Sequence, residues 1–403
     1  MQDIRRAAAA GAGVIRETPV LSSRTLSERT GMTVVLKAEN LQSTGSFKIR
    51  GALAKIASLG DACRPGVVAA SAGNHGQAVA YAARELGVDC HVFMPESAPI
   101  GKTEATAALG AHVRLVGETV DESLAAAQQW AGESGLAFVH PFDDPTVIAG
   151  QGGLGLELVA QVPALVRVIV PVGGGGLVSG VAIAVKSQRP EVEVIGVQVE
   201  ACAPFAASLA AGEPVAVTSA MTIADGIAVK RPGALTLELI ARWVDGVVVV
   251  GEDEVAEAMV FLLERAKLVV EGAGAVGVAA LLAGAVPWAD GSRSGTTAVI
   301  LSGGNVDPGL LAQIARRHES QAGRRFVLLA RLPDRPGSLA LLLSLVGQLG
   351  ANLLDVEHIR EGFDLHVRES AVQLVLETRG SEHADRVQTA IRAAGYTEPR
   401  AVR

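Results

Sequence analysis

Residues 166–177, VRVIVPVGGGGL, decide the fold of this chain. The run 166–172 is short, apolar and rich in valine, as expected of a strand buried on both faces. Four glycines follow, and Val178–Val185 then has the composition of a buried helix. Four glycines in succession weaken a fold unless something needs the bare backbone, and free N–H groups at a helix start hold phosphate well. The stretch therefore predicts a strand–turn–helix unit with a phosphate site at its turn.

Similar apolar runs recur along the chain and alternate with helical patterns. The other predicted strands of this part are Val34–Lys37, Gly66–Ala70, Asp89–Met94, His112–Val116, Ala137–His140, Glu193–Val199, Val247–Val250 and Thr297–Leu301. The stretches between most of them are rich in Ala, Leu and Glu and have helical periodicity. This alternation predicts an α/β fold with mostly parallel, buried strands.

A different pattern begins near residue 320. The predicted order is strand Phe326–Arg331, helix Ser338–Leu349, strands Asn352–His358 and Ala371–Glu377, and helix Glu382–Ala394. A β-α-β-β-α order is the split βαβ arrangement of ferredoxin-like βαββαβ domains. We therefore expect two domains, residues 1–322 and residues 323–403.

Composition and charge exclude several classes of protein. The chain carries 35 basic and 42 acidic side chains, a formal charge of −7, with no basic block, so we expect no nucleic-acid partner. The three cysteines, Cys63, Cys90 and Cys202, are scattered and form no CxxC pair, which favours a reducing cytoplasm. Two uncharged stretches, 168–185 and 272–289, are interrupted by glycines or a proline, which predicts buried units and no membrane partner.

A lysine lies in the first of three further small-residue loops, Ser46–Gly51. Taken alone, Lys48 would be a solvated charge. Between Phe47 and Ile49 at a helix start, however, partial burial and the helix dipole both lower an ammonium pKa. A Schiff-base lysine requires such a lowered pKa.

The other two loops follow predicted strands. Ser71–Gln77 (SAGNHGQ) presents backbone N–H groups at a helix start, which can bind a carboxylate, although a tight turn capped by Asn74 also fits. For His75 alone, a packed histidine is the more ordinary interpretation. Ser302–Asn305 (SGGN) lies at the carboxyl end of a strand, where open α/β sheets bind ligands, and a plain turn is the alternative.

A nucleotide-binding alternative comes from two GxGxxG matches, Gly150–Gly155 and Gly272–Gly277. A dinucleotide site also needs an acidic residue about 20 positions further along the chain. Neither Val172–Gly175 nor Thr296–Val299 contains one. A nucleotide cofactor is therefore not expected.

Taken together, the loops resemble the serine/threonine dehydratases, which are fold-type II pyridoxal-phosphate enzymes. Ser46–Gly51, Ser71–Gln77, Gly173–Leu177 and Ser302–Asn305 carry the resemblance, and Pro141–Pro145, Thr222–Val229 and Val270–Gly274 also match. The resemblance covers residues 15–310 and is strongest to the threonine dehydratases. It implies two open, twisted, mostly parallel α/β subdomains that bind pyridoxal 5′-phosphate.

The resemblance implies roles for four side chains in particular. Lys48 would hold the cofactor covalently and later take the Cα proton of the substrate. Phe47 would pack on the pyridine ring, and Asn74 would hydrogen-bond the 3′-hydroxyl. Ser302 would face the pyridine nitrogen.

It also implies three binding sets. The phosphate would be held by Gly173, Gly174, Gly175, Gly176 and Leu177. The substrate carboxylate would be received by Ser71, Ala72, Gly73, Asn74 and His75. Glu200 matches a position where relatives hold a structural cation, monovalent or divalent, whereas a surface glutamate is an equally good interpretation.

An enzyme of this kind would convert L-threonine to 2-oxobutanoate and ammonia, with L-serine, which gives pyruvate, as an alternative substrate. A serine-preferring dehydratase or a serine racemase is the alternative within the family. Similar racemases tend to carry a hydroxyl where this chain has Ala72, so the alanine favours elimination. The alternative of another class is a catalytically silent amino-acid sensor, against which the retention of Lys48, Asn74 and Ser302 argues.

Residues 323–403 resemble an ACT domain, a small amino-acid-binding regulatory domain, with Asp334-Arg335-Pro336-Gly337 after the first strand. Gly337 would let the backbone groups of an effector approach, and a turn cap is the alternative. Relatives pair such domains across subunits, so the resemblance implies a homo-oligomer, a dimer or tetramer, regulated by an amino acid. Both isoleucine synthesis and threonine breakdown are compatible with this arrangement.

Overall fold

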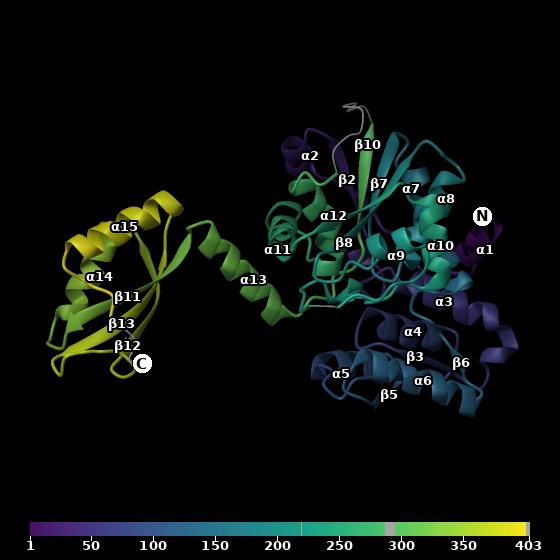
Figure 1. Ribbon diagram of the computed structural model, residues 1–403, viewed down its shortest axis with the longest axis horizontal. Helices are drawn as coiled ribbons and strands as arrows, with labels where there is room; N and C mark the ends of the chain where they lie inside the picture. Colours follow the sequence, from purple (N-terminus) through teal and green to yellow (C-terminus); the bar gives the residue numbers. More distant parts are fainter. Residues whose placement is uncertain (219, 287–294, 400–403) are drawn as a thin grey trace. The chain divides into compact units, whose positions relative to one another are not determined.

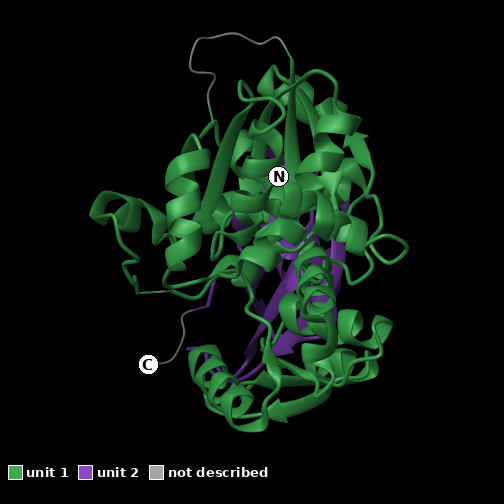
Figure 2. Ribbon diagram, turned by 90° about the vertical axis from the view of Figure 1, so that its right-hand side faces the viewer, with its two compact units in different colours: residues 1–306 green, residues 307–403 purple. Residues whose placement is uncertain are grey.

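The computed structural model divides the chain into two compact units, Met1–Val306 and Asp307–Arg403 (Figure 2). It describes residues 1–218, 220–286 and 295–399. The division falls earlier than the expected boundary at residue 322, because helix α13 (Pro308–Gln321) is counted with the second unit. This helix leads directly into the first strand of that unit and contacts it.

The larger sheet of the first unit has the strand order β1-β2-β10-β7-β8-β9. Figure 1 labels four of these strands, β2, β10, β7 and β8. Its strands are β1 (Val20–Ser22), β2 (Thr33–Ala38), β7 (Leu165–Pro171), β8 (Glu193–Val199), β9 (Gly246–Val250) and β10 (Thr296–Leu301). Every neighbouring pair is parallel except β1 with β2. The sequence did not predict β1, because three residues are too few to carry a periodic signal.

A smaller sheet of the same unit has the order β5-β4-β3-β6 and is parallel throughout. Its strands are β3 (Val67–Ala70), β4 (Cys90–Met94), β5 (His112–Leu115) and β6 (Ala137–Phe138). Two open, mostly parallel α/β subdomains were predicted, and the two sheets confirm them.

Helices surround both sheets. The α-helices of the first unit are α1 (Gln2–Ala10), α2 (Arg24–Thr30), α3 (Lys48–Leu59), α4 (Asn74–Glu85), α5 (Ile100–Ala108), α6 (Val120–Ser134), α7 (Pro145–Gln161), α8 (Gly176–Lys186), α9 (Phe205–Ala211), α10 (Ala234–Trp243), α11 (Glu252–Phe261) and α12 (Gly272–Leu282). Short turns of 3-10 or π-helix are η1 (Glu39–Leu41), η2 (Gly60–Cys63), η3 (Asp225–Ile227) and η4 (Leu262–Ala266). Helix α11 passes directly into the π-helical η4, and Lys267 ends it at a φ of 58°.

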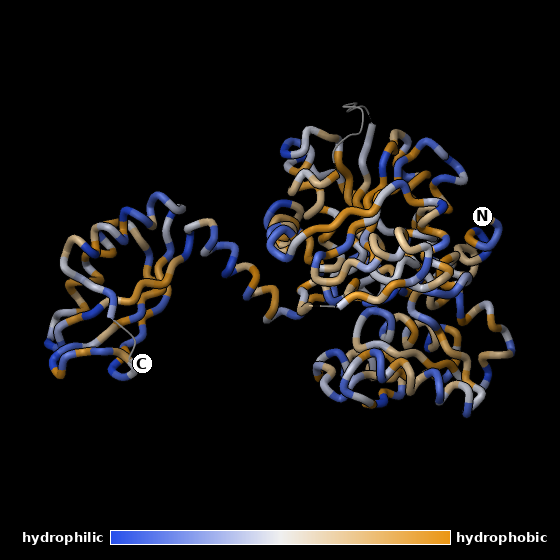
Figure 3. The backbone as a smooth tube through the Cα atoms, viewed as in Figure 1, coloured by the Kyte–Doolittle hydropathy of each residue, from blue (hydrophilic) through white to orange (hydrophobic). Residues whose placement is uncertain are grey.

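The larger sheet is buried on both faces, as the unbroken apolar strands require. Val168 and Val170 pack in a core with α7, α8 and α10 on one face. On the other face a Cβ built on Gly277 of α12 would lie 3.2 Å from Ile169. Figure 3 shows the strands of the sheet as predominantly hydrophobic.

The glycines of the excluded nucleotide motif Gly150–Gly155 lie inside α7 and bring helices close together. A Cβ on Gly150 would lie 2.6 Å from the carbonyl oxygen of Arg50 in α3, and one on Gly155 would lie 2.8 Å from Ala184 in α8. Side chains at these positions would push the helices apart. The close packing of α3, α7 and α8 fixes the start of α3, where Lys48 lies, relative to the start of α8.

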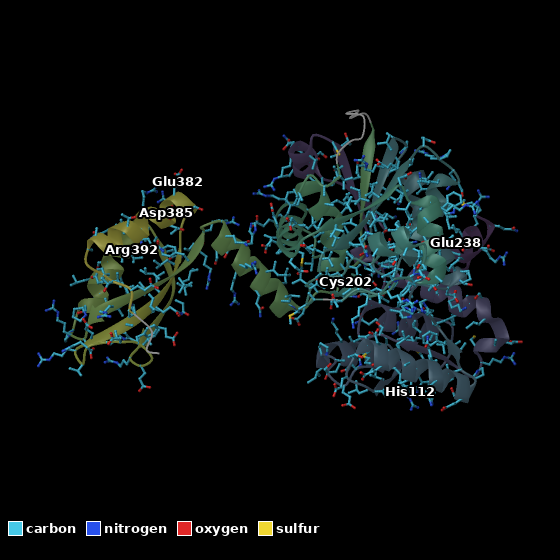
Figure 4. The ribbon with its side chains drawn as sticks, in the orientation of Figure 1. His112, Cys202, Glu238, Glu382, Asp385 and Arg392 are labelled. Carbon is cyan, nitrogen blue, oxygen red and sulfur yellow. The ribbon has the colours of Figure 1, made fainter. Side chains whose placement is uncertain are left out.

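The second unit continues after α13 with β11 (Arg325–Pro333), α14 (Ser338–Gln348), β12 (Asn352–Ile359), β13 (Glu369–Glu377) and α15 (Ser381–Ala393). The three strands form an antiparallel sheet in the order β11-β13-β12. Leu328, Leu374 and Val387 belong to the core between the sheet and the two helices. On the exposed side of α15 lie Glu382, Asp385 and Arg392, which Figure 4 labels.

The order of elements in this unit is the predicted β-α-β-β-α. The last strand of a βαββαβ domain is not assigned among residues 394–399. The N–H of Arg331 in β11 nevertheless donates to the carbonyl oxygen of Thr397 at 2.8 Å. The segment after α15 therefore contacts β11, the strand beside which a final ferredoxin-like strand would lie.

None of the described helices is long and apolar enough to cross a membrane. The uncharged stretch 168–185 is divided between β7 and α8. In the second stretch, residues 272–282 form the buried helix α12, and residues 287–289 lie outside the described residues.

Candidate active site

Three of the four predicted loops lie at the carboxyl ends of parallel strands, where open α/β sheets bind ligands. Gly173–Gly176 follows β7 and Ser302–Asn305 follows β10 of the larger sheet, while Ser71–Gln77 follows β3 of the smaller one. The N–H of Phe47 donates to the carbonyl oxygen of Ser302 at 3.0 Å, which joins the first loop to the last. The structure thus gathers loops from both sheets into one region.

Lys48 is the first residue of α3, as predicted. Its Nζ donates a 3.0 Å hydrogen bond to the carbonyl oxygen of Pro141 and lies 5.3 Å from the centre of the Phe47 ring. Burial lowers the pKa of Lys48 to about 8, against an opposing attraction from Glu271. At pH 7 such an amine is neutral in about a tenth of the molecules, against fewer than about one in a thousand for an ordinary lysine. Lys48 is therefore suited to form an imine and to accept a proton.

Each glycine of the Gly173–Gly176 loop is required by its surroundings. A Cβ on Gly174 would lie 2.3 Å from the ring of Phe142, and one on Gly173 would lie 3.0 Å from the backbone of Ile227. Gly175 has a φ of 93°, in the left-handed region that favours glycine, and caps α8 without a side-chain hydrogen bond. The first turn of α8 therefore presents backbone N–H groups that no side chain caps, a geometry suited to a phosphate.

Asn74 opens α4, with Gly73 as the N-cap residue, and does not itself cap the helix. Its Nδ2 donates to Oε1 of Glu271 at 2.7 Å. Its Oδ1 accepts from Nδ2 of Asn305 at 2.8 Å. The side chain of Asn74 is therefore held from two sides by residues of the larger subdomain.

The loop before Asn74 has room for a ligand. Nothing lies within 4 Å of a Cβ built on Gly73, and the N–H of Gly73 donates to the Ser71 hydroxyl at 3.1 Å. Ser71, Ala72 and Gly73 are partly exposed. Small residues beside open space at the start of α4 fit the expected carboxylate site.

His75 is a packed histidine, the more ordinary of the two interpretations. It is buried, and its Nε2 lies 2.9 Å from the carbonyl oxygen of Val139, which can only accept, so Nε2 carries the proton. Burial lowers the pKa of His75 to about 3, so the ring is neutral. The side chain fastens the loop to the segment after β6, and its backbone N–H stays a predicted carboxylate ligand.

Four predicted site residues remain: Ser302, Phe47, Leu177 and Glu200. Ser302 is buried at the end of β10, and Phe47 is half-buried immediately before Lys48. The side chain of Leu177 is buried in the core beneath α8, so only its backbone N–H is placed to meet a phosphate. Glu200 follows β8 and is exposed, and no cluster of three or more His, Cys, Asp or Glu side chains suited to a metal occurs in the described parts of the chain. The cation site stays a prediction.

Sequence reasoning did not single out four residues that the structure brings to the site. Pro141 accepts from Lys48, and Phe142 packs on the glycine loop. Glu271 and Asn305 hold Asn74. All four lie in stretches that carried the resemblance, but no local pattern separated them from their neighbours.

These residues together fit pyridoxal phosphate. The glycine turn supplies a bare backbone at a helix start, Lys48 supplies a buried amine of lowered pKa, and Asn74 supplies an amide that Glu271 holds in place. The Ser302 loop passes over Glu271 without a side chain, since a Cβ on Gly303 would lie 2.1 Å from Oε1 of Glu271. Such a cofactor requires an amine that binds it covalently, an amide that donates a hydrogen bond to it, and N–H groups that hold its phosphate.

Comparisons with known proteins agree with this site. Residues 12–303 match the family described as "Pyridoxal-phosphate dependent enzyme". The L-threonine ammonia-lyase of Thermotoga maritima is 46% identical over 397 residues, which cover 98% of each chain.

Solved structures give the same result. The structure of a threonine deaminase from "T.th." superposes with a TM-score of 0.71 at 42% identity and covers 76% of this chain and 98% of that one. The structure of maize serine racemase superposes with a TM-score of 0.74 at 36% identity and covers 79% of this chain and 98% of that one. Because the family match spans most of the sequence and includes Lys48, Asn74, the glycine turn and Ser302, this chain belongs to the family of pyridoxal-phosphate-dependent enzymes.

Proposed function

We propose that this chain is a threonine ammonia-lyase that converts L-threonine to 2-oxobutanoate and ammonia. The observation that carries the proposal is the buried amine of Lys48 at the start of α3. Its Nζ donates to the carbonyl oxygen of Pro141, the residue before Phe142, whose ring packs on the glycine turn, and burial lowers its pKa to about 8. The identity of 46% to an L-threonine ammonia-lyase over 98% of each chain supports threonine as the substrate.

Lys48 has the central role in the proposed mechanism. Bound pyridoxal phosphate withdraws electrons from the substrate and makes its Cα proton acidic. Nζ of Lys48, once free, accepts that proton, and its lowered pKa makes the neutral amine available near pH 8. The proton that Nζ of Lys48 removed from Cα is passed to the β-hydroxyl, which leaves as water. Hydrolysis of the released enamine then consumes one water and yields the 2-oxo acid and ammonia.

The Ser71–His75 loop holds the substrate in this proposal. The N–H groups at the start of α4 bind the substrate carboxylate. Neutral His75 donates its Nε2–H to the carbonyl oxygen of Val139, so this proton is not available to the substrate. Ala72 has no hydroxyl that could return a proton to the second face of Cα, which favours elimination over racemisation.

Regulation by an amino acid is proposed for the second unit. A cavity of about 230 Å³ lies at the start of α14 and is lined by residues that include Asp334, Gly337, His358 and Ser370. It is smaller than the roughly 300–1,000 Å³ sites of drug-sized ligands, so a single amino acid suits it. Gly337, with a φ of 89°, caps α14 without a side chain, so the N–H groups of Leu339 and Ala340, which line the cavity, are open to an effector carboxylate.

The proposal also includes a homo-oligomer, a dimer or tetramer, that acts in the cytoplasm. Light scattering of the purified protein measures the subunit number, and a single-subunit mass would contradict the oligomer.

Titration calorimetry with isoleucine, valine and threonine tests the effector site. Asp334→Ala should weaken the binding of an amino acid that wild type binds.

The deciding experiment incubates the purified protein with pyridoxal phosphate and L-threonine and follows 2-oxobutanoate, with Lys48→Ala as the control. Product from wild type alone supports the lyase. D-Serine from L-serine, without 2-oxo acid, would establish the racemase instead. No product from either substrate, with cofactor bound, would support the silent sensor.

A further inference from the structure

Glu271 is a buried carboxylate whose side chain is turned away from its own helix. It is the N-cap residue of α12 and is 6% exposed, yet it makes no side-chain cap hydrogen bond. Its Oε1 instead accepts from Nδ2 of Asn74, 197 residues earlier in the chain. Among the ion pairs of the described residues none includes Glu271. A buried carboxylate without an ion pair is costly, so a functional reason for it is worth seeking.

A chain of hydrogen bonds fixes the orientation of the Asn74 amide. The Nδ2 of Asn305 donates to the carbonyl oxygen of Thr44 at 2.9 Å, and that oxygen can only accept. The same Nδ2 lies 2.8 Å from Asn74, so the atom it meets there must be the oxygen Oδ1. The other end of the amide is then Nδ2, which donates to Glu271. Of the two N–H bonds of Asn74 Nδ2, one is used by Glu271 and one is left.

The carboxylate is held from a second side. Besides Asn74, the backbone N–H of Asn305 acts on Glu271 and favours its charged form, which lowers its pKa. Gly303 closes over it, since a Cβ there would lie 2.1 Å from Oε1 of Glu271 and 3.3 Å from Nδ2 of Asn74. Glu271 and Asn74 are therefore packed as one rigid pair.

We propose that Glu271 is a positioning residue for the cofactor, which holds the Asn74 amide so that its remaining Nδ2–H meets the 3′-oxygen of pyridoxal phosphate. The inference rests on the proposed role of Asn74 at that oxygen. An ionised Glu271 accepts from Asn74 and polarises its amide, which strengthens the second N–H as a donor. A neutral side chain at position 271 polarises it less.

Titration of Glu271 supports a dependence on pH. Burial raises the pKa of Glu271 to about 7, with the hydrogen bond from Asn74 opposing and the charge of Asp225 adding. Lys102 and Lys48 are the cations that act on it from α5 and α3. Glu271 therefore changes from carboxyl to carboxylate near neutral pH, and its hold on Asn74 strengthens as the pH rises.

The test compares wild type with Glu271→Gln, which keeps the shape and removes the charge. Glu252→Gln is the matched control, because Glu252 also begins a helix and accepts a backbone hydrogen bond, from Ile223 at 3.0 Å, without contacting Asn74. Two quantities are measured: the absorption band of the bound cofactor between about pH 5.5 and 8.5, and the Kd of pyridoxal phosphate for the protein freed of cofactor.

In wild type and in Glu252→Gln the intensity of the absorption band should change with pH, with a midpoint near pH 7. In Glu271→Gln that midpoint should vanish, and the Kd should rise about three- to tenfold, as for one weakened hydrogen bond. The kcat for L-threonine should fall more than KM changes. A midpoint that persists in Glu271→Gln, or an unchanged Kd, would overturn the inference.

Neither spectrum nor Kd requires substrate, so a protein that binds cofactor without converting threonine still tests this inference. If Glu271→Gln does not fold, Asn305→Ala takes its place. That variant frees the other end of the Asn74 amide and should raise the Kd while the midpoint near 7 persists. A wild-type Kd in Asn305→Ala would count against the hydrogen-bond chain.

Discussion

Replacing Gly174 by alanine tests whether the glycine turn is needed for both packing and cofactor binding. The new Cβ would lie 2.3, 2.4 and 2.5 Å from three atoms of the Phe142 ring. Carbon atoms normally approach to about 3.5–4.0 Å, so the ring or the turn must move by about 1 Å or more. The φ of Gly174 is outside the left-handed region, so the effect is purely steric.

The magnitude has two parts. Overpacking of this kind costs about 1–3 kcal/mol of folding stability. A shift of the turn that breaks one charge-assisted hydrogen bond to the phosphate costs about 1.5–3 kcal/mol of binding, or about a 10- to 150-fold rise in the Kd of pyridoxal phosphate. Each kcal/mol of folding stability that the substitution removes should lower the Tm by about 2–4 °C.

Equilibrium dialysis measures the Kd, and thermal unfolding of the cofactor-free protein measures the Tm. Gly132→Ala on α6 is the control, because nothing lies within 4 Å of its Cβ, and it should leave the Kd unchanged. Phe142→Ala should partly restore the Tm of Gly174→Ala, since it removes the ring that the methyl meets. A Gly174→Ala protein with wild-type Kd and Tm would refute the reasoning.

The site and its supporting residues give three more predictions. Arg50→Met should lower the free energy of unfolding by about 3–5 kcal/mol, because it leaves the carboxylates of Glu39 and Glu157 without the buried guanidinium that binds both; urea unfolding with an unchanged midpoint would contradict this. The rate at which cofactor-free protein takes up pyridoxal phosphate should rise with pH and level off above about 8, where Lys48 is neutral; stopped-flow absorbance that still rises steeply at pH 10 would show an ordinary lysine. Ala72→Ser should form D-serine from L-serine, measured by chiral chromatography, and its absence would remove the assigned reason for elimination.

Much of the fold was predictable because its signals are local. The predicted strand 166–172 differs from β7 by one residue at each end, and α3 begins at Lys48 as expected. A strand buried on both faces must be apolar along its length, and a helix that opens with glycine leaves its N–H groups bare. Each of these patterns is complete within about ten residues, so the sequence alone determines the strand–loop–helix units and their order.

Tertiary structure decided which side chains meet. Asn74 is 197 residues from Glu271 and 231 from Asn305, and Lys48 is 93 from Pro141. The pKa of about 7 for Glu271 and of about 8 for Lys48 arises from burial, which depends on every element packed around the site. Local periodicity reports which residues face a core, but the distance between two loops is set by the packing of helices and sheets. The sequence therefore determines which chemical groups each loop carries. The folded chain alone determines how the loops are oriented toward one another and how readily Lys48 and Glu271 are ionised.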